Sequence, residues 1–284
     1  MQLLGEVTGG AAGPVLKWAG GKRQMLRQFS PLFPKQLPAV YHEPFLGSGA
    51  VFFCLKPGAS YLTDSSEELI NFYMVLKSSV EDLILDLDKH VHTKAYYYRI
   101  RSEDPRTLTS VERASRFLYL NKCGYNGLWR VNRAGRNNVP YGSYKNPNYR
   151  NFAALRKAGM ALHSAVLQRD DFEITLEQAL PEDFIYCDPP YHPLSETASF
   201  RSYTAGSFTL SDQQRLAGMF HELDKRGCLV MASNSDTPFI RKIYAGYNIT
   251  TVRGRRAINC RGTGRSPVNE LVIRNYGRPV ESRI

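Results

Sequence analysis

The sequence predicts an α/β fold in which a Rossmann-like, mostly parallel sheet carries an inserted helical plus β-hairpin domain. Three observations predict this class. Short apolar runs alternate with helical patterns in both halves of the chain, which is typical of a parallel sheet covered by helices. A glycine-rich turn at residues 46–50 joins the first predicted strand to a helix. The alternation stops between residues 67 and 152, so we interpret that region as an insertion.

The N-terminal segment contains a glycine turn flanked by charge and a ring. Residues 1–14, rich in glycine and alanine, are predicted to be a flexible leader. Lys17 and Trp18 then precede a double-glycine turn at residues 20–21, and Lys22 follows it. Glycine lets a backbone approach a ligand closely, and the nearby cation and ring suit ligand binding. The alternative is an ordinary helix start with solvated lysines.

The first predicted strand, residues 39–45, runs into a turn containing Gly47 and Gly49, and a helix follows. This order brings a nucleotide-like ligand to a helix N-terminus. Phe52 stands where the dinucleotide fingerprint has its third glycine. The turn therefore indicates a cofactor without specifying NAD.

Asp64 ends a second predicted strand, residues 60–63. An acidic residue at this distance from the glycine turn can reach a ribose hydroxyl. It can also cap the helix that the following residues predict, and the two roles are compatible.

The predicted insertion combines helices, one of them beginning near Ser110, with a turn-rich hairpin at residues 131–144. Basic and aromatic side chains are interleaved from residue 96 to residue 157, opposed locally only by Glu103, Asp104 and Glu112. The basic residues are Arg99, Arg101, Arg106, Arg113, Arg116, Lys122, Arg130, Arg133, Arg136, Lys145, Arg150, Arg156 and Lys157. Such a set suits a DNA-contacting surface, because cations bind phosphates and Arg or Asn can read base edges. A solvated basic face is the alternative.

The sheet pattern resumes after the insertion. Strands are predicted at residues 166–172, 184–188, 228–232, 247–252 and 268–273. A helix is predicted from Ser211 to Lys225, with Ser211 and Gln214 as its capping box and Gly227 as its end. Thr237 and Pro238 predict the start of a short helix. The arginine-rich loop at residues 253–265 is either phosphate-facing or simply a flexible surface loop.

The tetrapeptide Asp188-Pro189-Pro190-Tyr191 follows the apolar run 184–187, at the strand end where open α/β sheets bind ligands. Neither proline has an N–H, and each fixes its own φ, so this backbone is stiff. Asp188 and the Pro189 carbonyl can accept the two N–H groups of an exocyclic amine, while Tyr191 offers a stacking face to a base. A rigid strand exit with an N-capping aspartate is the alternative.

Composition limits the class of protein. With 284 residues and 43% hydrophobic content the chain can bury a sizeable core and is not of the disordered class. A net charge of +11 and a pI near 9.4 indicate a polyanionic partner. Five scattered cysteines argue against a disulfide framework or zinc site and for a reducing cytosol. No apolar run is long enough to span a bilayer, and the N-terminus lacks the pattern of a signal peptide.

Four motifs together, at residues 17–22, 43–49, 121–130 and 188–191, resemble the DNA adenine methylase (Dam) family, the α-group (D12 class) of N6-adenine DNA methyltransferases. The resemblance runs from about Val15 to Tyr276. It implies a methyltransferase sheet formed by residues 15–66 and 153–284, with residues 67–152 as the target-recognition domain. Trp129 departs from the small cysteine common at its position in the family.

The resemblance also implies the site residues and partners. The cofactor would be S-adenosylmethionine, bound by Trp18, Lys22, Phe45, Gly47, Gly49, Asp64, Asp171, Phe172 and Asp188. Asp188, Pro189, Pro190 and Tyr191 would be catalytic. Double-stranded DNA would be contacted by Lys17, Tyr125, Asn126, Leu128, Arg130, Pro140 and Tyr144. Of these, Tyr125 and Asn126 match wedge positions near the flipped base, and the others match readers of GATC. The family further implies a bacterial or phage enzyme that is a monomer in solution, can place more than one copy on one DNA, acts without a metal and lies in the cytoplasm, associated with the nucleoid.

Our hypothesis for the reaction is direct in-line transfer of a methyl group to the adenine amine, with no covalent enzyme intermediate. An N4-cytosine methyltransferase would use the same acceptors. Three further functions stay open at this point: a catalytically inactive DNA-binding regulator, an RNA base methyltransferase and a nicotinamide enzyme. Phe52 and the basic insertion disfavour the nicotinamide enzyme.

Overall fold

The computed structural model describes residues 11–36, 38–132, 134–194, 208–255 and 267–277, and they group into two compact units. Unit 1 consists of Met1–Gln24, Gly47–Lys56 and Ser66–Arg169, and unit 2 of Met25–Leu46, Pro57–Ser65 and Asp170–Ile284. The predicted insertion, residues 67–152, lies entirely within unit 1. Its role as a separate domain stays a prediction.

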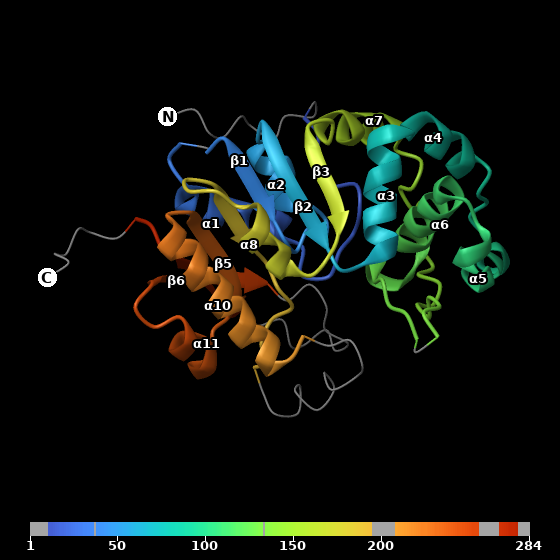
Figure 1. Ribbon diagram of the computed structural model, residues 1–284. Coiled ribbons are helices and arrows are strands. Elements are labelled where there is room, and N and C mark those ends of the chain that lie inside the picture. Colours follow the sequence, from blue (N-terminus) through green and yellow to red (C-terminus); the bar gives the residue numbers. More distant parts are fainter. Residues whose placement is uncertain (1–10, 37, 133, 195–207, 256–266, 278–284) are drawn as a thin grey trace, which may run out of the picture. The chain divides into compact units, whose positions relative to one another are not determined.

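Unit 2 contains a sheet whose first four strands are parallel (Figure 1). Along the sheet, the strands of this unit are β2 (Ala59–Asp64), β1 (Val40–Glu43), β4 (Phe184–Cys187), β5 (Leu229–Ser235), β7 (Pro267–Arg274) and β6 (Asn248–Arg255). Tyr41 pairs with Phe184 across β1 and β4, and Phe184 with Leu229 across β4 and β5. The strand β7 runs antiparallel to both of its neighbours, β5 and β6, and Met231 of β5 lies opposite Arg274 of β7. The predicted Rossmann-like α/β class is confirmed.

The strand β4 is buried along its whole length, which explains its uninterrupted apolar run. On one face of the sheet, α10 (Leu210–Arg226) covers β5 with an apolar stripe that includes Leu216, Phe220 and Leu223. These side chains join Ile185 and Val230 in one buried cluster. The cluster anchors the strand whose end carries Asp188.

The N-terminal cap of α10 differs from the predicted one. The Thr209 hydroxyl accepts a hydrogen bond from the Asp212 N–H at 3.2 Å, and Asp212 Oδ2 accepts one from the Thr209 N–H at 2.8 Å. The predicted box of Ser211 and Gln214 is therefore wrong by two residues. Both pairs have the required spacing, but an aspartate carboxylate is the stronger acceptor at the positive end of a helix. Gly227 ends the helix at φ 88°, as predicted.

Short helices complete unit 2. They are α1 (Leu26–Phe29), η2 (Ser30–Leu32), η5 (Phe172–Ile174), α8 (Thr175–Gln178) and α11 (Pro238–Ile243). Thr237 caps α11 as predicted, because its side chain accepts from the Ile240 N–H. The predicted strand at residues 166–172 is shorter in the structure. It ends at Arg169, and Asp171 instead caps η5 by accepting from the Glu173 N–H at 3.0 Å.

Unit 1 is mainly helical, with one strand, β3 (Ala165–Arg169), in the part that the structure describes. Its elements are η1 (Lys22–Gln24), α2 (Ala50–Leu55), α3 (Glu67–Ser78), α4 (Val80–Asp88), α5 (Lys94–Ser102), η3 (Pro105–Thr107), α6 (Ser110–Cys123), η4 (Tyr125–Gly127) and α7 (Phe152–Ala161). The helix α6 packs against α3, α4 and α5 and buries Phe117, Leu118 and Leu120. It begins at Ser110, as predicted, with Thr109 as its cap.

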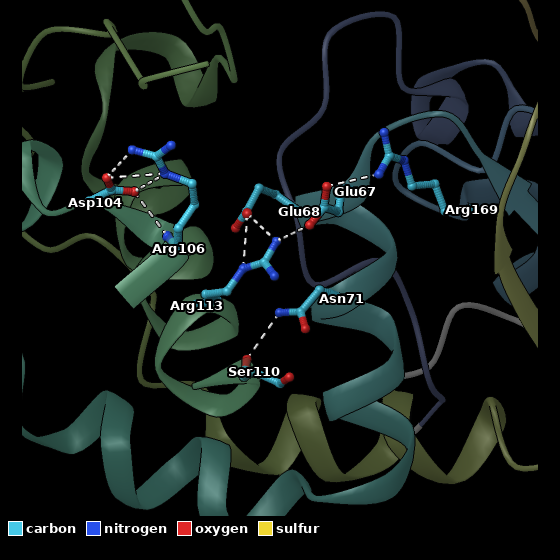
Figure 2. A network of polar contacts seen from close by, with 8 residues as sticks. All are labelled: Glu67, Glu68, Asn71, Asp104, Arg106, Ser110, Arg113 and Arg169. Carbon is cyan, nitrogen blue, oxygen red and sulfur yellow. Dashed lines mark hydrogen bonds and ion pairs between the residues drawn. The ribbon is translucent and has the colours of Figure 1, made fainter. Parts of the chain in front are cut away.

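A network of ion pairs joins the N-terminal ends of α3 and α6 (Figure 2). Arg113 donates to Glu67 at 2.8 Å and to Glu68 at 2.5 Å, and Arg169 at the end of β3 also pairs with Glu67 at 2.8 Å. The Asn71 amide donates to the Ser110 carbonyl at 3.0 Å. The helix α3 starts at Glu67 with Ser66 at its N-cap position, so the interpretation of Asp64 as the N-cap residue is wrong.

The predicted hairpin at residues 131–144 is a tight turn with little strand pairing. In the described part of this segment, only two isolated bridges are present, Gly124 with Tyr141 and Val131 with Asn137. The Asn138 N–H donates to the Arg130 carbonyl at 3.0 Å. The turn residues predicted the reversal correctly, but side-chain contacts with unit 1 helices replace a long ladder here.

The loop between α4 and α5 contains a buried histidine with two hydroxyl partners. His90 lies 2.9 Å from the Tyr96 hydroxyl and 3.0 Å from the Ser115 hydroxyl, and it stacks on Tyr119. Burial lowers the pKa of His90 from 6.5 to about 4. The folded protein therefore keeps this ring neutral at pH values where an unfolded histidine takes up a proton.

We expect the free energy of unfolding to fall between pH 6.5 and about 4, because only the unfolded His90 binds a proton there. The slope contributed by one full proton is about 1.4 kcal/mol per pH unit. His90→Gln should remove this contribution, whereas the same change at the exposed His163 should not. Urea denaturation of the three proteins across this pH range measures the difference. Identical slopes for wild type and His90→Gln would contradict it.

Candidate active site

Asp188 is the first residue after β4, and a side chain of the adjacent strand holds its carboxylate. The Ser233 hydroxyl on β5 donates to Asp188 Oδ1 at 2.8 Å. That bond uses the single hydroxyl proton of Ser233, so the Tyr186 hydroxyl, 3.1 Å away, donates to Ser233 Oγ. Burial raises the pKa of Tyr186 well above its ordinary value, and the Asp188 charge adds to the rise. A chain of two buried hydroxyls therefore fixes one oxygen of Asp188.

The backbone after Asp188 is held by three further polar side chains. Gln213 Nε2 on α10 donates to the Pro190 carbonyl at 2.9 Å. Asn234 Oδ1 accepts from the His192 N–H at 3.0 Å, and Ser235 Oγ donates to the His192 carbonyl at 2.6 Å. Asn234 Nδ2 also donates to Gln213 Oε1 at 3.0 Å, which links the two elements. The loop is thus fixed from β5 and from α10 at once.

The Pro189 carbonyl, unlike the Pro190 carbonyl, has no hydrogen-bond donor among the described residues. Pro189 is buried, yet none of the described residues donates a hydrogen bond to its carbonyl oxygen. The next residue is Pro190, which has no N–H to offer. The Pro189 carbonyl oxygen, one residue from the Asp188 carboxylate, is therefore a candidate acceptor for a ligand N–H.

Tyr191 is oriented by a residue that the sequence did not single out. Its hydroxyl donates to Glu270 Oε2 on β7 at 2.8 Å. Burial raises the pKa of Tyr191 well above its ordinary value, and the charges of Asp188 and Glu270 raise it further. The hydroxyl is therefore protonated throughout the neutral range, and the half-buried ring is held at its outer end.

A third carboxyl group lies at the end of β1. Glu43 is 2% exposed and accepts a hydrogen bond from the Tyr41 hydroxyl at 2.8 Å. Besides Asp188, Glu43 and Glu270 contribute to the raised pKa of Tyr186, so all three carboxyl groups act on one buried ring. Acidic side chains from β1, from the end of β4 and from β7 therefore lie close enough to act on the same phenol.

An aromatic cluster holds two of the residues predicted to bind the cofactor. Phe45 and Phe172 stack with their centroids 5.3 Å apart, and the Arg215 guanidinium lies 4.8 Å from the Phe172 centroid. Arg215 also pairs with Asp171 at 2.8 Å and with Glu173 at 2.6 Å. Phe45, Asp171 and Phe172 are thus brought together, with the carboxylate of Asp171 already bound by Arg215.

In unit 1, the predicted glycine turns have the expected backbone. Gly47 has φ 47°, and a Cβ there would lie 2.8 Å from Trp18 Cδ1, so only glycine allows this approach. Gly49 has φ 64° just before α2. Lys22 is buried and donates to the Gly20 carbonyl at 2.7 Å, within its own turn. Gly47 and Gly49 thus have the positive φ that glycine favours, while the binding of a cofactor at these turns stays a prediction.

The predicted DNA contacts gather near η4 in unit 1. Lys17 Nζ lies 4.1 Å from the centroid of the Tyr144 ring, and Arg130 Nε donates to Asn138 Oδ1 at 2.6 Å. The Tyr125 N–H donates to the Pro140 carbonyl at 2.8 Å, and its side chain is 47% exposed.

The turn itself departs from regular helix geometry. Asn126, which follows Tyr125, has the positive φ of 54°. Leu128 closes the turn, and its N–H donates to the Tyr125 carbonyl at 3.2 Å. The unusual Trp129 packs on Phe117 with centroids 4.4 Å apart. The large ring therefore fills space against α6.

Many of the basic residues in the predicted surface are already paired. Arg116 is 3% exposed and donates to the carbonyls of Ile100 and Arg101. Arg113 and Arg156 bind acidic residues from outside the segment, Arg113 through Glu67 and Glu68 and Arg156 through Glu81 at 2.6 Å. The expectation that only Glu103, Asp104 and Glu112 oppose these charges is wrong, because folding brings in acids from α3 and α4. Arg133 lies outside the described residues.

The part of the chain that the structure describes lacks two kinds of feature. No group of three or more His, Cys, Asp or Glu side chains is placed to hold a metal ion. None of the described helices is both long and apolar enough to cross a membrane. The leader up to residue 10 and most of the arginine-rich loop lie outside the described residues.

The sequence did not identify Ser233, Asn234, Ser235, Gln213 or Glu270 as part of this site. A signal was available for the first three, since a buried strand that ends in Ser-Asn-Ser must find partners for its polar groups. Nothing local distinguished Gln213 from other glutamines. Its 1% exposure on an otherwise apolar helix face is visible only in the folded chain.

Comparison with known proteins identifies the family of this chain. Residues 18–258 match the family of D12 class N6 adenine-specific DNA methyltransferases. The chain belongs to this family. It is therefore an adenine-specific DNA methyltransferase, and its substrate is DNA.

Several relatives of this methyltransferase are similar over nearly their whole length. The type II methyltransferase M.MjaIII of Methanocaldococcus jannaschii is 41% identical over 93% of this chain and 99% of its own. The type II methyltransferase M1.LlaDCHI of Lactococcus lactis subsp. cremoris is 39% identical over 93% and 95%. A DNA adenine methylase of Vibrio cholerae is 37% identical over 90% and 94%.

We expect Gln213→Leu to lower the turnover of this methyltransferase about tenfold or more, because it leaves the Pro190 carbonyl and the Asn234 amide without their shared partner. Gln214→Leu is the matched control, since Gln214 is the next residue of the same helix and is exposed. Initial rates on unmethylated DNA, with circular dichroism to verify folding, measure the effect. Equal rates for the two variants would show that Gln213 does not hold the loop.

Proposed function

We propose that this enzyme transfers the methyl group of S-adenosylmethionine to N6 of an adenine that has been flipped out of duplex DNA, within the sequence GATC. The observation that carries the proposal is the rigid set of acceptors formed by Asp188 and the Pro189 carbonyl. The resemblance of the chain to proteins named DNA adenine methylase supports the choice of GATC.

The acceptor set suits the chemistry of an adenine amine. The N6 lone pair is conjugated with the purine ring and is a poor nucleophile. Hydrogen bonds from the two N6–H groups to Asp188 and to the Pro189 carbonyl favour a pyramidal nitrogen whose lone pair is free to attack. Because these acceptors are fixed before the substrate arrives, little reorganisation is needed during the reaction. No covalent enzyme intermediate is required.

The residues of unit 2 fit a cationic methyl donor. When bound, S-adenosylmethionine supplies a methyl group on a positively charged sulfonium. The acidic side chains of Asp188, Glu43 and Glu270 all act on the Tyr186 phenol, and such a group of acids would stabilise a nearby cation. Phe45 and Phe172 present stacked rings of the kind that holds an adenine moiety.

We propose that the other residues predicted to bind the cofactor do so, with the exception of Asp171. Asp64 ends β2, where its carboxylate would bind the ribose hydroxyls. Trp18, Lys22, Gly47 and Gly49 of unit 1 are proposed to contribute as well. The Asp171 carboxylate is already bound by Arg215. We therefore propose that Asp171 positions Phe172 and does not bind the cofactor directly.

DNA recognition is proposed to use the residues near η4. Flipping a base costs a few kcal/mol, which stacking on Tyr191 and insertion of the exposed Tyr125 and Asn126 would offset. The base-pair readers would be Lys17, Leu128, Arg130, Pro140 and Tyr144. The enzyme would act as a monomer, with more than one copy able to occupy one DNA molecule, in the cytoplasm where its DNA substrate lies.

We expect Asp188→Ala to abolish methyl transfer, a loss of about a thousandfold or more, while DNA affinity stays nearly unchanged. Asp236→Ala is the control, because Asp236 follows β5 much as Asp188 follows β4 and pairs with Arg241. The experiment incubates mixed-sequence DNA with labelled S-adenosylmethionine and maps the modified bases. Methylated adenine within GATC supports the proposal, and methylated cytosine, another sequence or an active Asp188→Ala variant would overturn it.

We expect Arg130→Ala to relax discrimination at one guanine by about 1 to 3 kcal/mol, the value of a bidentate arginine contact with guanine. Arg136→Ala, which removes an exposed arginine of the same turn, should instead weaken binding to all DNA sequences alike. Rates on duplexes with single base-pair replacements separate the two outcomes. A uniform loss for Arg130→Ala would identify Arg130 as a phosphate contact.

A further inference from the structure

Asn121, in the last turn of α6, is fully buried and uses every donor of its amide. Its Oδ1 accepts from the Lys17 N–H at 2.9 Å. Its Nδ2 donates to the Lys17 carbonyl at 2.6 Å and to the Gly127 carbonyl at 3.1 Å. One side chain therefore joins two backbone segments that are about a hundred residues apart in sequence.

The first of these segments carries a cation with a defined position. Both backbone groups of Lys17 are bound by Asn121, and the Lys17 ammonium lies over the Tyr144 ring. Tyr144 is itself held, because His92 Nε2 lies 2.7 Å from its carbonyl oxygen. A carbonyl can only accept, so His92 carries its proton on Nε2. The direction of the Lys17 side chain is thus set by contacts at both ends.

The second segment is the turn η4. Gly127, which accepts from Asn121, has φ 64°, and a Cβ at this position would overlap the Lys17 side chain. The turn therefore packs directly on Lys17. Tyr125 and Leu128 belong to the same turn as Gly127, because the Leu128 N–H donates to the Tyr125 carbonyl.

We propose that Asn121 is a positioning residue that sets the register between Lys17 and the turn η4, and that it thereby determines sequence discrimination at the base pair that Lys17 contacts. This inference rests on the proposed function, in which both segments contact DNA. Asn121 does not touch DNA itself, since it is 0% exposed. A shift of either segment by part of an ångström would separate the Lys17 ammonium from its base edge while leaving the acceptors at Asp188 unchanged.

Asn121→Asp is the principal test, because it keeps the oxygen that accepts from Lys17 and replaces the two donors by an acceptor. Asn275→Asp is the matched control. Asn275 also makes three hydrogen bonds, with the Val230 N–H, Asp224 Oδ1 and the Cys228 carbonyl, but it lies in unit 2. Asn121→Ser is the second variant, whose shorter side chain can reach Lys17 but not both carbonyls, and it keeps the test available if Asn121→Asp fails to fold.

The measurement is kcat/KM on duplexes in which each base pair of the mapped site is replaced in turn. Lys17→Met first identifies the position at which Lys17 discriminates. At that same position, we expect Asn121→Asp to lower the ratio of kcat/KM between the correct and the replaced base pair about tenfold. The ratios at the other positions should stay nearly unchanged. In the Lys17→Met background, Asn121→Asp should cause little further loss there, because the two residues act as one unit.

The outcomes separate this inference from the proposed function. If the wild-type enzyme is site-specific but Asn121→Asp behaves like Asn275→Asp at every position, the positioning role is overturned and the proposed function stands. A loss that is additive with Lys17→Met also overturns it. If the wild-type enzyme methylates no adenine at a defined site, the proposed function fails and this inference fails with it.

Discussion

The active site depends on one constraint, the hydrogen bonds that hold the backbone from Asp188 to His192. Two consecutive prolines remove two backbone donors from this loop, so side chains must hold it in place. Ser233 and Asn234 on β5 and Gln213 on α10 supply that support. Ser233, Asn234 and Gln213 are themselves buried, so a hydrogen bond left unmade by one of them would be costly. Rigidity of the acceptors thus follows from burial of their partners.

Electrostatics in unit 2 follows from the same arrangement. Carboxyl groups at strand ends are expensive to bury unless hydroxyl groups bind them. Tyr41 binds Glu43, and Tyr191 binds Glu270, so each phenol keeps its proton and each acid keeps a donor. Hydrogen bonds thus fix these carboxyl groups, and in the function that we propose they would stabilise a cationic methyl donor.

Unit 1 illustrates why net charge is a poor guide to a binding surface. The sequence places many arginines between residues 99 and 157, but Arg113 and Arg116 are engaged in ion pairs or carbonyl contacts that stabilise the helices. Figure 2 shows how Arg113 and Arg169 share the acids of α3. Lys17 and Arg130, the cations that we propose to read base pairs, are held instead by Tyr144 and Asn138.

The sequence by itself determined the α/β class, the strands around β4, the glycine turns and the family, because these depend on local apolar periodicity, backbone stereochemistry and short motifs. It also placed the helix ends to within a few residues, although two equally spaced capping boxes near α10 could not be ranked without knowing where the helix begins. The tertiary structure alone decided the hydrogen-bond partners of Asp188, Tyr191 and Asn121. Those contacts join residues 45, 79 and 104 positions apart, and no local pattern specifies which distant side chain will fill a buried donor or acceptor.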